Sequence, residues 1–348
     1  MRENNFDLLR VIAALQVMIM HTTAHILLEH DYTLNTFWTF IIEILSYIEG
    51  VPIFFLISGF LITMSYERNS NIKNYIQNRV LRIFPGLYVN IFLGVIILYY
   101  FEYLQFNLEF FSWLMAQLTI VQFYNAEMFR GFGVGVINGS LWTISVELSF
   151  YILLPLLFLV LKKQKVFFII IGLVSFIIWN YDFNSEKDVF INKLIHVSIL
   201  PYIFLFIIGI CFYKFFDNVK SYIENKFGVW CIAFIIFNSI VYYFSLENNY
   251  FINILKWFIF SFFIFSFVFS FRNLSYRILH GNDYTYGIYI YHMLIINILV
   301  HLNLVSEIKY FIIVIILSII LGIFSWHFIE KPMLRLKKHS IFKQREKL

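Results

Sequence analysis

The sequence predicts an all-helical integral membrane protein, a bundle of about ten transmembrane helices with the N-terminus and the C-terminus in the cytoplasm. Of its 348 residues, 61% are hydrophobic and only 14% are charged, whereas about a quarter of the residues of a soluble domain carry charge. The mean hydropathy is +0.78. A soluble core of this length cannot bury so many apolar side chains, so lipid must cover many of them.

Apolar segments long enough to cross a bilayer, which takes roughly 20 residues, recur along the whole chain. No change in composition divides it, so we expect one transmembrane domain over residues 1–335, followed by a basic cytoplasmic tail over 336–348. The predicted spans are 8–28, 44–66, 86–104, 141–161, 165–181, 194–213, 228–246, 252–271, 284–303 and 309–329.

The distribution of basic residues gives the predicted orientation. With the N-terminus inside, 20 of the 26 Lys and Arg residues fall in inside segments, five fall outside, and Arg10 lies within the first span. Basic residues collect in short cytoplasmic loops in this way. The same bias explains the net charge of +5. We therefore expect contacts with membrane lipids and no nucleic acid, because nucleic-acid binding needs a basic face on a soluble fold.

The first span contains two polar residues, Arg10 and His21. Their spacing of eleven residues places them on one helix face, about 16 Å apart along the axis. His21 then lies past the midplane of a hydrocarbon core of ~30 Å. An ionisable group at this depth indicates function by default, and the alternative is a buried contact that only holds helices together.

The fourth span carries Glu147, about 9 Å from the outer boundary and thus level with His21. A histidine and a carboxylate at one depth in different helices can form a general base and its orienting partner. A hydrogen bond with a purely structural role is the alternative. Trp142 and Ser145 precede Glu147 in the same segment and belong to the secondary part of this candidate site.

Arg79 and Arg82 follow the second span on the predicted cytoplasmic side. Arginines three residues apart share a helix face and suit a phosphate-bearing ligand. Anchoring to anionic lipid headgroups is the alternative.

Several further residues are structural or secondary candidates. Ser58 and Gly59 favour close helix packing. His292 is either a packed core histidine or a second polar contact at the site, and Glu330 is expected to form a cap or an ion pair at the inner surface. His21 and His25 have the spacing of metal ligands. The sequence offers no clear third ligand, so no metal is expected.

The longest outside loop, 105–140, contains four glycines and several aromatic residues. Such a loop either folds back against the membrane domain or serves as a flexible connector.

Six of these segments, in this order, resemble the signatures of the membrane-bound acyltransferase-3 family. The resemblance covers residues 6 to about 335. Its motifs are Arg10 with His21 after ten intervening residues, Gly50 to Ile62, Arg79 with Arg82, Ser140 to Glu147, Tyr286 to His292, and Phe328 to Pro332. Pro52 departs from the pattern, because an acidic or polar residue is common at that position.

The resemblance implies a ten-helix O-acetyltransferase of the bacterial cytoplasmic (inner) membrane. It implies acetyl-CoA, or another acyl-CoA, as a cytoplasmic donor substrate and no permanently bound cofactor. The implied acceptor is a hydroxyl of a lipid-linked or exported surface glycan, such as O-antigen or capsule. His21, Glu147 and Arg10 would be catalytic, and Arg79 and Arg82 would bind the donor. The alternatives are a glycan or lipid transporter and a non-catalytic subunit of a polysaccharide assembly system.

Overall fold

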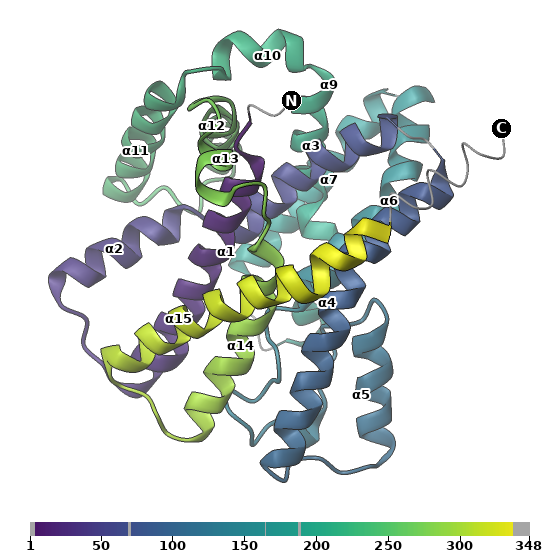
Figure 1. Ribbon diagram of the computed structural model, residues 1–348. Helices are drawn as coiled ribbons and strands as arrows, with labels where there is room; N and C mark the ends of the chain where they lie inside the picture. Colours follow the sequence, from purple (N-terminus) through teal and green to yellow (C-terminus); the bar gives the residue numbers. More distant parts are fainter. Residues whose placement is uncertain (1–3, 69–70, 164, 187–188, 337–348) are drawn as a thin grey trace. The chain divides into compact units, whose positions relative to one another are not determined.

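The computed structural model describes residues 4–68, 71–163, 165–186 and 189–336 (Figure 1). Every regular element within these ranges is a helix, which confirms the predicted fold class. The basic tail predicted for 336–348 lies outside the described residues, apart from Leu336.

The chain forms two compact units. Among the described residues, unit 1 comprises 4–13, 50–68 and those between 152 and 281, and unit 2 comprises 14–49, 71–151 and 282–336. Helix α1 (Phe6–Thr22) begins in unit 1 and ends in unit 2, whereas α6 (Trp142–Lys163) begins in unit 2 and ends in unit 1.

Unit 1 is organised around the packing of α3 against α9. A Cβ atom on Gly59 would overlap the carbonyl oxygen of Phe206, and one on Gly209 would overlap that of Leu56. The two glycines therefore let the backbones touch, as small residues do between membrane helices. The helices of this unit are α3 (Gly50–Arg68), α7 (Lys165–Asn184), α8 (Phe190–Val197), η4 (Leu200–Tyr202), α9 (Ile203–Lys214), α10 (Phe216–Ile223), α11 (Phe227–Tyr243), α12 (Tyr250–Phe269) and α13 (Leu274–Leu279).

Unit 2 is organised around α14, which packs against α15, α4 and the π-helical segment η1. Gly287 of α14 lies against Gly322 of α15, so these two helices also approach closely, side by side in Figure 1. The elements of this unit are η1 (Thr23–Leu27), η2 (Leu28–His30), α2 (Thr36–Tyr47), α4 (Ile72–Tyr100), α5 (Leu108–Leu118), η3 (Glu127–Phe129), α14 (Thr285–His301), α15 (Ile308–Ser325) and η5 (Trp326–Glu330).

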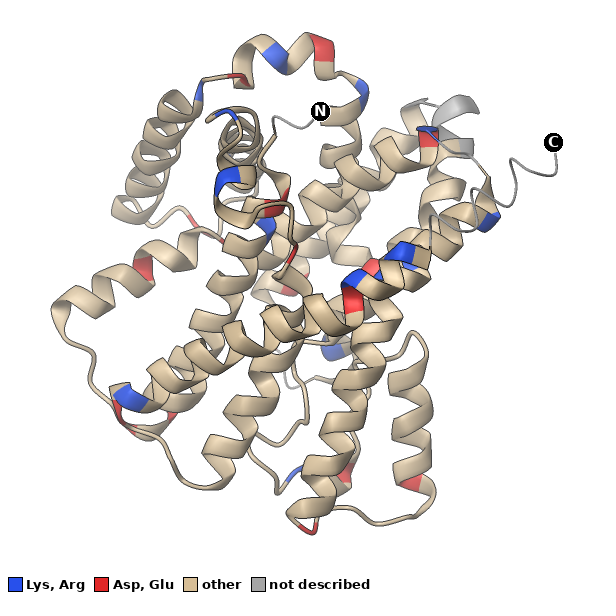
Figure 2. Cartoon of the chain, viewed as in Figure 1, with Lys and Arg blue, Asp and Glu red and all other residues tan. Residues whose placement is uncertain are grey.

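The helices have the length and composition of a multi-pass membrane protein. Among the described residues, six are long and apolar enough to cross a membrane, or up to eight if each of two bent pairs counts as one span. Two shorter apolar helices cover 142–158 and 285–301. Figure 2 shows α11 and α15 uncharged along most of their lengths, with charged residues at or beyond their ends. The multi-pass helical class is thus confirmed, while the number of ten spans stays a prediction.

Exposed apolar stripes mark the surfaces that lipid would cover. On α7, Ile169, Leu173 and Ile177 follow one another at helical spacing and are more than half exposed. Exposing such a stripe to water is unfavourable, whereas contact with lipid hydrocarbon is not.

The segment 105–140 folds back onto unit 2. It contains α5, which packs against α4, and the loop after α5 is tied to α14 by Asn297. The amide of Asn297 accepts a hydrogen bond from the backbone N–H of Val134 (2.9 Å) and donates to the carbonyl oxygens of Val136 and Ile137 (3.0 and 3.1 Å). Of the two interpretations of this loop, the structure favours the folded-back form.

Candidate functional site

His21 and His292 form the central polar contact of unit 2. His21 lies in the last turn of α1, directly before the π-helical segment, and His292 lies midway along α14. Nδ1 of His21 is 2.9 Å from Nε2 of His292, and the ring centroids are 5.2 Å apart. His292 is fully buried, whereas His21 is only partly buried. The buried His292 ring therefore holds the His21 ring in place, and His21 remains the more accessible of the two.

The turn of α14 that carries His292 is held by a buried amide network. The carbonyl oxygen of Ile290 accepts hydrogen bonds from the side-chain amides of Asn90 and Asn138, both at 2.7 Å. Asn138 also donates to the side-chain oxygen of Asn90 at 3.1 Å and accepts from the Ser140 hydroxyl at 2.7 Å. These contacts join α4, the segment before α6, and α14. They fix the backbone that positions His292.

A second contact joins α6 to α14 beside this network. The hydroxyl groups of Thr143 and Tyr289 lie 2.7 Å apart, and both residues are buried. Tyr289 also donates to the carbonyl oxygen of Ser140 at 3.3 Å. The start of α6, which carries the motif ending at Glu147, is therefore held against α14 by hydrogen bonds.

Glu147 contacts a tyrosine rather than a histidine. Its carboxylate accepts a hydrogen bond from the hydroxyl of Tyr151, one turn further along α6. The guanidinium carbon of Arg79 lies 5.2 Å from the Tyr151 ring centroid and 5.7 Å from that of Tyr75. Within unit 2 the acidic and basic candidates Glu147 and Arg79 thus meet at one tyrosine.

Arg79 and Arg82 have different surroundings. Nη2 of Arg82 donates to Oδ2 of Asp283 at 2.6 Å, which connects α4 to the residues before α14. Arg79 makes no ion pair with any carboxylate of the described residues, and its Nε is buried without a hydrogen-bond partner among them. Arg79 is therefore the member of the pair whose charge is available to an anion.

The remaining candidates are spread over both units. Arg10 lies partly buried on α1 and takes part in a polar interaction. Ser58 precedes Gly59 on α3, at the contact with α9.

On α6, Trp142 is the first residue, and the hydroxyl of Ser145 donates to the side chain of Gln122 at 2.7 Å. Glu330 is buried and accepts a hydrogen bond from Ser325 at 2.8 Å. No group of three His, Cys, Asp or Glu residues able to hold a metal ion occurs in the part of the chain that the structure describes.

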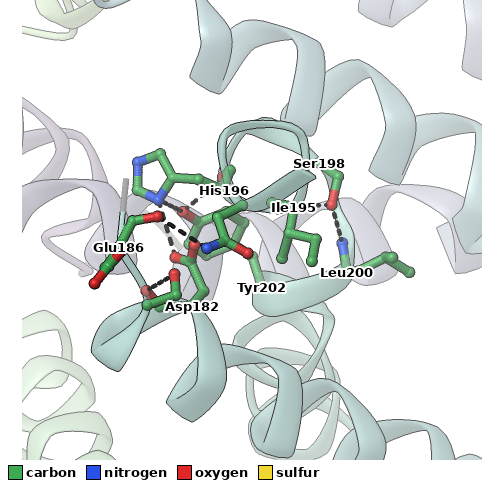
Figure 3. Close-up of polar contacts among 9 residues, drawn as sticks. Asp182, Glu186, Ile195, His196, Ser198, Leu200 and Tyr202 are labelled. Atoms are coloured by element: carbon green, nitrogen blue, oxygen red, sulfur yellow. Dashed lines mark hydrogen bonds and ion pairs between the residues drawn. The ribbon is translucent and has the colours of Figure 1, made fainter. Parts of the chain in front are cut away.

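A second histidine pairing lies in unit 1, where α7, α8 and η4 meet (Figure 3). Nδ1 of His196 is 2.9 Å from Oδ2 of Asp182, which is buried, while His196 is about two-fifths exposed. The hydroxyl of Tyr202 donates to the carbonyl oxygen of His196 at 3.0 Å. The sequence does not indicate this pair, because Asp182 and His196 lie near opposite ends of the polar connection between two predicted spans.

Comparison with known proteins identifies the chain. The sequence profile of a family described as "Acyltransferase domain" matches residues 3–327. The chain belongs to the acyltransferase-3 family. This acyltransferase is 30% identical to nodulation protein 10 of Rhizobium leguminosarum bv. viciae over 354 residues, which cover 96% of this chain and 94% of the relative.

Two further relatives match over parts of their lengths. The O-acetyl transferase of Shigella phage Sf6 is 29% identical over 177 residues, about half of each chain. The peptidoglycan O-acetyltransferase OatA of Listeria monocytogenes is 33% identical over 127 residues, which cover 33% of this chain and 20% of OatA. No solved structure matches. The protein is a membrane O-acyltransferase, as its resemblance to the family predicted.

Proposed function

We propose that this acyltransferase moves an acetyl group from cytoplasmic acetyl-CoA to a hydroxyl of a surface-glycan sugar in the bacterial cytoplasmic (inner) membrane. The family membership supports acyl transfer, and two relatives are named as O-acetyltransferases. The observation that carries the proposal is the contact between His21 and His292 inside a helical, apolar unit.

The histidine pair suits the proton transfers that the reaction needs. Neutral imidazole has one donor and one acceptor nitrogen, so one of the two facing nitrogens carries the shared proton. If Nδ1 of His21 donates to His292, Nε2 of His21 has a free lone pair. Nε2 then accepts the proton of the acceptor hydroxyl as its oxygen attacks the thioester carbonyl.

The same histidine also donates the proton to the leaving group. The new bond is the ester C–O bond, and the bond that breaks is the C–S bond of the thioester. The leaving thiolate takes the proton from Nε2 of His21 and departs as free CoA. His292, which is fully buried, holds the His21 ring in place throughout and does not contact the substrates.

The charged residues around Tyr151 bind and position the substrates. Arg79, whose charge no described carboxylate neutralises, contacts a phosphate of the donor, and Arg82 supports it from its ion pair with Asp283. Charge-assisted contacts of this kind suit phosphate. Glu147 contacts the acceptor or, through Tyr151, positions Arg79. Arg10 supports the inner end of α1, below His21 on the same helix.

The test uses purified protein in lipid nanodiscs with radiolabelled acetyl-CoA. His21→Ala should lower hydrolysis or transfer of the label by about 10²–10⁴-fold, the usual contribution of a general base, while acetyl-CoA still binds. His25→Ala is the comparison variant, because His25 lies one turn further on and its Nδ1 pairs with Glu29, while its ring centroid lies 6.2 Å from that of His21.

Two results would overturn the proposal in different ways. Undiminished transfer in His21→Ala would remove the histidine from the chemistry. Failure of folded wild-type protein to bind acetyl-CoA would remove the donor, and a role in glycan transport or assembly would then need to be examined.

A further inference from the structure

Two tyrosines of unit 2 flank the guanidinium group of Arg79, which belongs to the same unit. The guanidinium carbon lies 5.7 Å from the ring centroid of Tyr75 and 5.2 Å from that of Tyr151. Tyr75 precedes Arg79 by four residues on α4, and helical residues at this spacing share a face. Tyr151 comes from α6. Both tyrosines are buried, so water screens these contacts little.

Each of the two tyrosines is held at its hydroxyl end. The hydroxyl of Tyr75 donates to the backbone carbonyl oxygen of Tyr151 at 2.9 Å, and this hydrogen bond joins α4 to α6. The hydroxyl of Tyr151 donates to the carboxylate of Glu147, one turn earlier on α6. These contacts restrict both rings, so their positions beside Arg79 are established before any ligand binds.

The two rings orient Arg79 without neutralising it. A carboxylate partner would fix an arginine but would also offset its charge, as Asp283 does for Arg82. An aromatic face attracts a cation through its quadrupole and carries no net charge. Arg79 has no carboxylate partner among the described residues, and its Nε is buried without a hydrogen-bond partner there. The position of the guanidinium group therefore depends on the rings.

We propose that Tyr151 is a positioning residue for the transfer reaction, whose ring holds the Arg79 guanidinium group in place for a phosphate of the acyl-CoA donor. The inference rests on the proposed function, which gives Arg79 its ligand. It explains how Arg79 is oriented while keeping its full charge, and it assigns this effect to the ring of Tyr151 rather than to the hydroxyl. Tyr151 acts through Arg79 and contacts no substrate itself.

The benefit of such an arrangement is preorganisation. An arginine side chain has several rotatable bonds, and ordering it when a ligand binds lowers the affinity. With both rings in place, Arg79 is ordered before the donor arrives. Replacing Tyr151 by leucine removes one ring face and leaves the ligand to order the guanidinium group. The donor should then bind more weakly, although every group that touches it is unchanged.

The experiment measures the dissociation constants of two thioesters for purified protein in nanodiscs. Acetyl-CoA carries the phosphates, whereas acetyl-pantetheine carries the same thioester without any phosphate. The variants are Tyr151→Leu, Tyr151→Phe and the control Tyr88→Leu. Tyr88 is an exposed tyrosine of α4 whose hydroxyl donates to the carbonyl oxygen of Leu118 and whose ring lies against Phe84. Melting temperatures establish that each variant is folded.

Tyr151→Leu should bind acetyl-CoA about tenfold more weakly than wild type, the upper range for ordering one side chain on binding. Tyr151→Phe should stay within about twofold of wild type, because the ring face remains. Tyr88→Leu should match wild type. No variant should change the binding of acetyl-pantetheine, which offers Arg79 no phosphate. Equal weakening of both thioesters by Tyr151→Leu would indicate a general disturbance of the site, and the inference would fail.

A double-mutant cycle with Arg79→Gln isolates the contact between the ring and the guanidinium group. If the ring acts through Arg79, Tyr151→Leu should have no further effect on acetyl-CoA binding in the Arg79→Gln background. Losses that multiply in the double variant would overturn the inference. Equal weakening by Tyr151→Phe and Tyr151→Leu would also overturn it, because the hydroxyl and Glu147 would then determine the position of Arg79.

Failure of the proposed function would look different. Folded wild-type protein would then not bind acetyl-CoA, and the ring would have no affinity to support. If wild type binds acetyl-CoA and transfer depends on His21, while Tyr151→Leu binds acetyl-CoA as tightly as wild type, only the role of the Tyr151 ring is overturned.

Discussion

The two units each contain a paired histidine, and the partner differs. In unit 1, His196 faces the buried carboxylate of Asp182, and in unit 2, His21 faces the buried imidazole of His292. A carboxylate only accepts hydrogen bonds, so Nδ1 of His196 must carry a proton. An imidazole either donates or accepts, so the proton between His21 and His292 has two possible positions.

We expect different roles for the two pairs. The fixed proton of His196 locks its ring orientation and helps to hold α7, α8 and η4 together (Figure 3). In both pairs a proton on Nδ1 leaves Nε2 able to accept a proton and then donate it, but only His21 lies in a segment that resembles a signature of the family, Arg10 with His21. General acid–base catalysis needs such a group. We therefore expect the unit 1 pair to govern stability and the unit 2 pair to govern turnover.

The largest expected effect is on turnover when His292 is replaced. His292→Ala removes the partner of His21, and transfer should fall about 100-fold, at the low end of the effect of losing a general base. His292→Gln keeps an acceptor for the Nδ1–H of His21, so it should recover much of the melting temperature and of the transfer that His292→Ala loses. Single-turnover rates with labelled acetyl-CoA measure the effect, together with acetyl-CoA affinity.

His196→Ala is the matched variant in the other unit and should leave transfer close to wild type. Equal losses of transfer in His292→Ala and His196→Ala would erase the distinction between the pairs. Transfer as low in His292→Gln as in His292→Ala, in a folded protein, would show that His292 does more than hold the His21 ring.

Part of the candidate site could be predicted from the sequence, because helix periodicity gives the face and the approximate depth of a residue. His21 was singled out by its position past the midplane on the face of Arg10. His292 was named as a possible second polar contact, but its pairing with His21 could not be predicted, since the two lie 271 residues apart and chain order does not say which helices are neighbours. The amides of Asn90 and Asn138 were missed for the same reason. Nothing in the sequence marks either residue, and only the structure places their side chains 3.1 Å apart.

The helix boundaries show a similar limit. Hydropathy placed a span over 86–104, but α4 begins at Ile72 because the side chain of Asn71 accepts hydrogen bonds from the backbone N–H groups of Lys73 and Asn74. Capping thus extends a helix through polar residues that a hydropathy window rejects. Helix α5 lies within the loop predicted over 105–140, because a helix of eleven residues is too short to register as a span.

The second largest effect should be on stability, in unit 1. Asp182→Ala removes the carboxylate from His196 and should lower the free energy of unfolding by about 1–3 kcal/mol, the usual range for a lost hydrogen bond to a charged group. Thermal unfolding in detergent measures it, and transfer per folded molecule should not change. Loss of transfer in a folded Asp182→Ala protein would place this pair in the chemistry and contradict the distinction.

A smaller loss of stability is expected when one of the two amides that support the His292 turn is removed. In Asn138→Ala, the carbonyl oxygen of Ile290 keeps its hydrogen bond from Asn90, so stability should fall by about 1 kcal/mol. Asn90→Ala should behave alike. The double variant leaves that carbonyl without either side-chain donor, so its loss should exceed the sum of the single losses. Strictly additive losses would show that the two amides act independently.

The smallest effect should come from the third histidine pairing, which lies at the surface. Nδ1 of His25 is 2.9 Å from the carboxylate of Glu29, four residues on, but the Glu29 side chain is more than half exposed. Water and salt screen such a pair, so Glu29→Ala should change the free energy of unfolding by only about 0–1 kcal/mol and leave transfer unchanged. The distance is the same as in the pair of His196 and Asp182, in which the carboxylate is buried. If Glu29→Ala nevertheless destabilised the protein as much as Asp182→Ala, burial would not be what distinguishes the carboxylate pairs, and the contrast between the units would have to rest on partner chemistry alone.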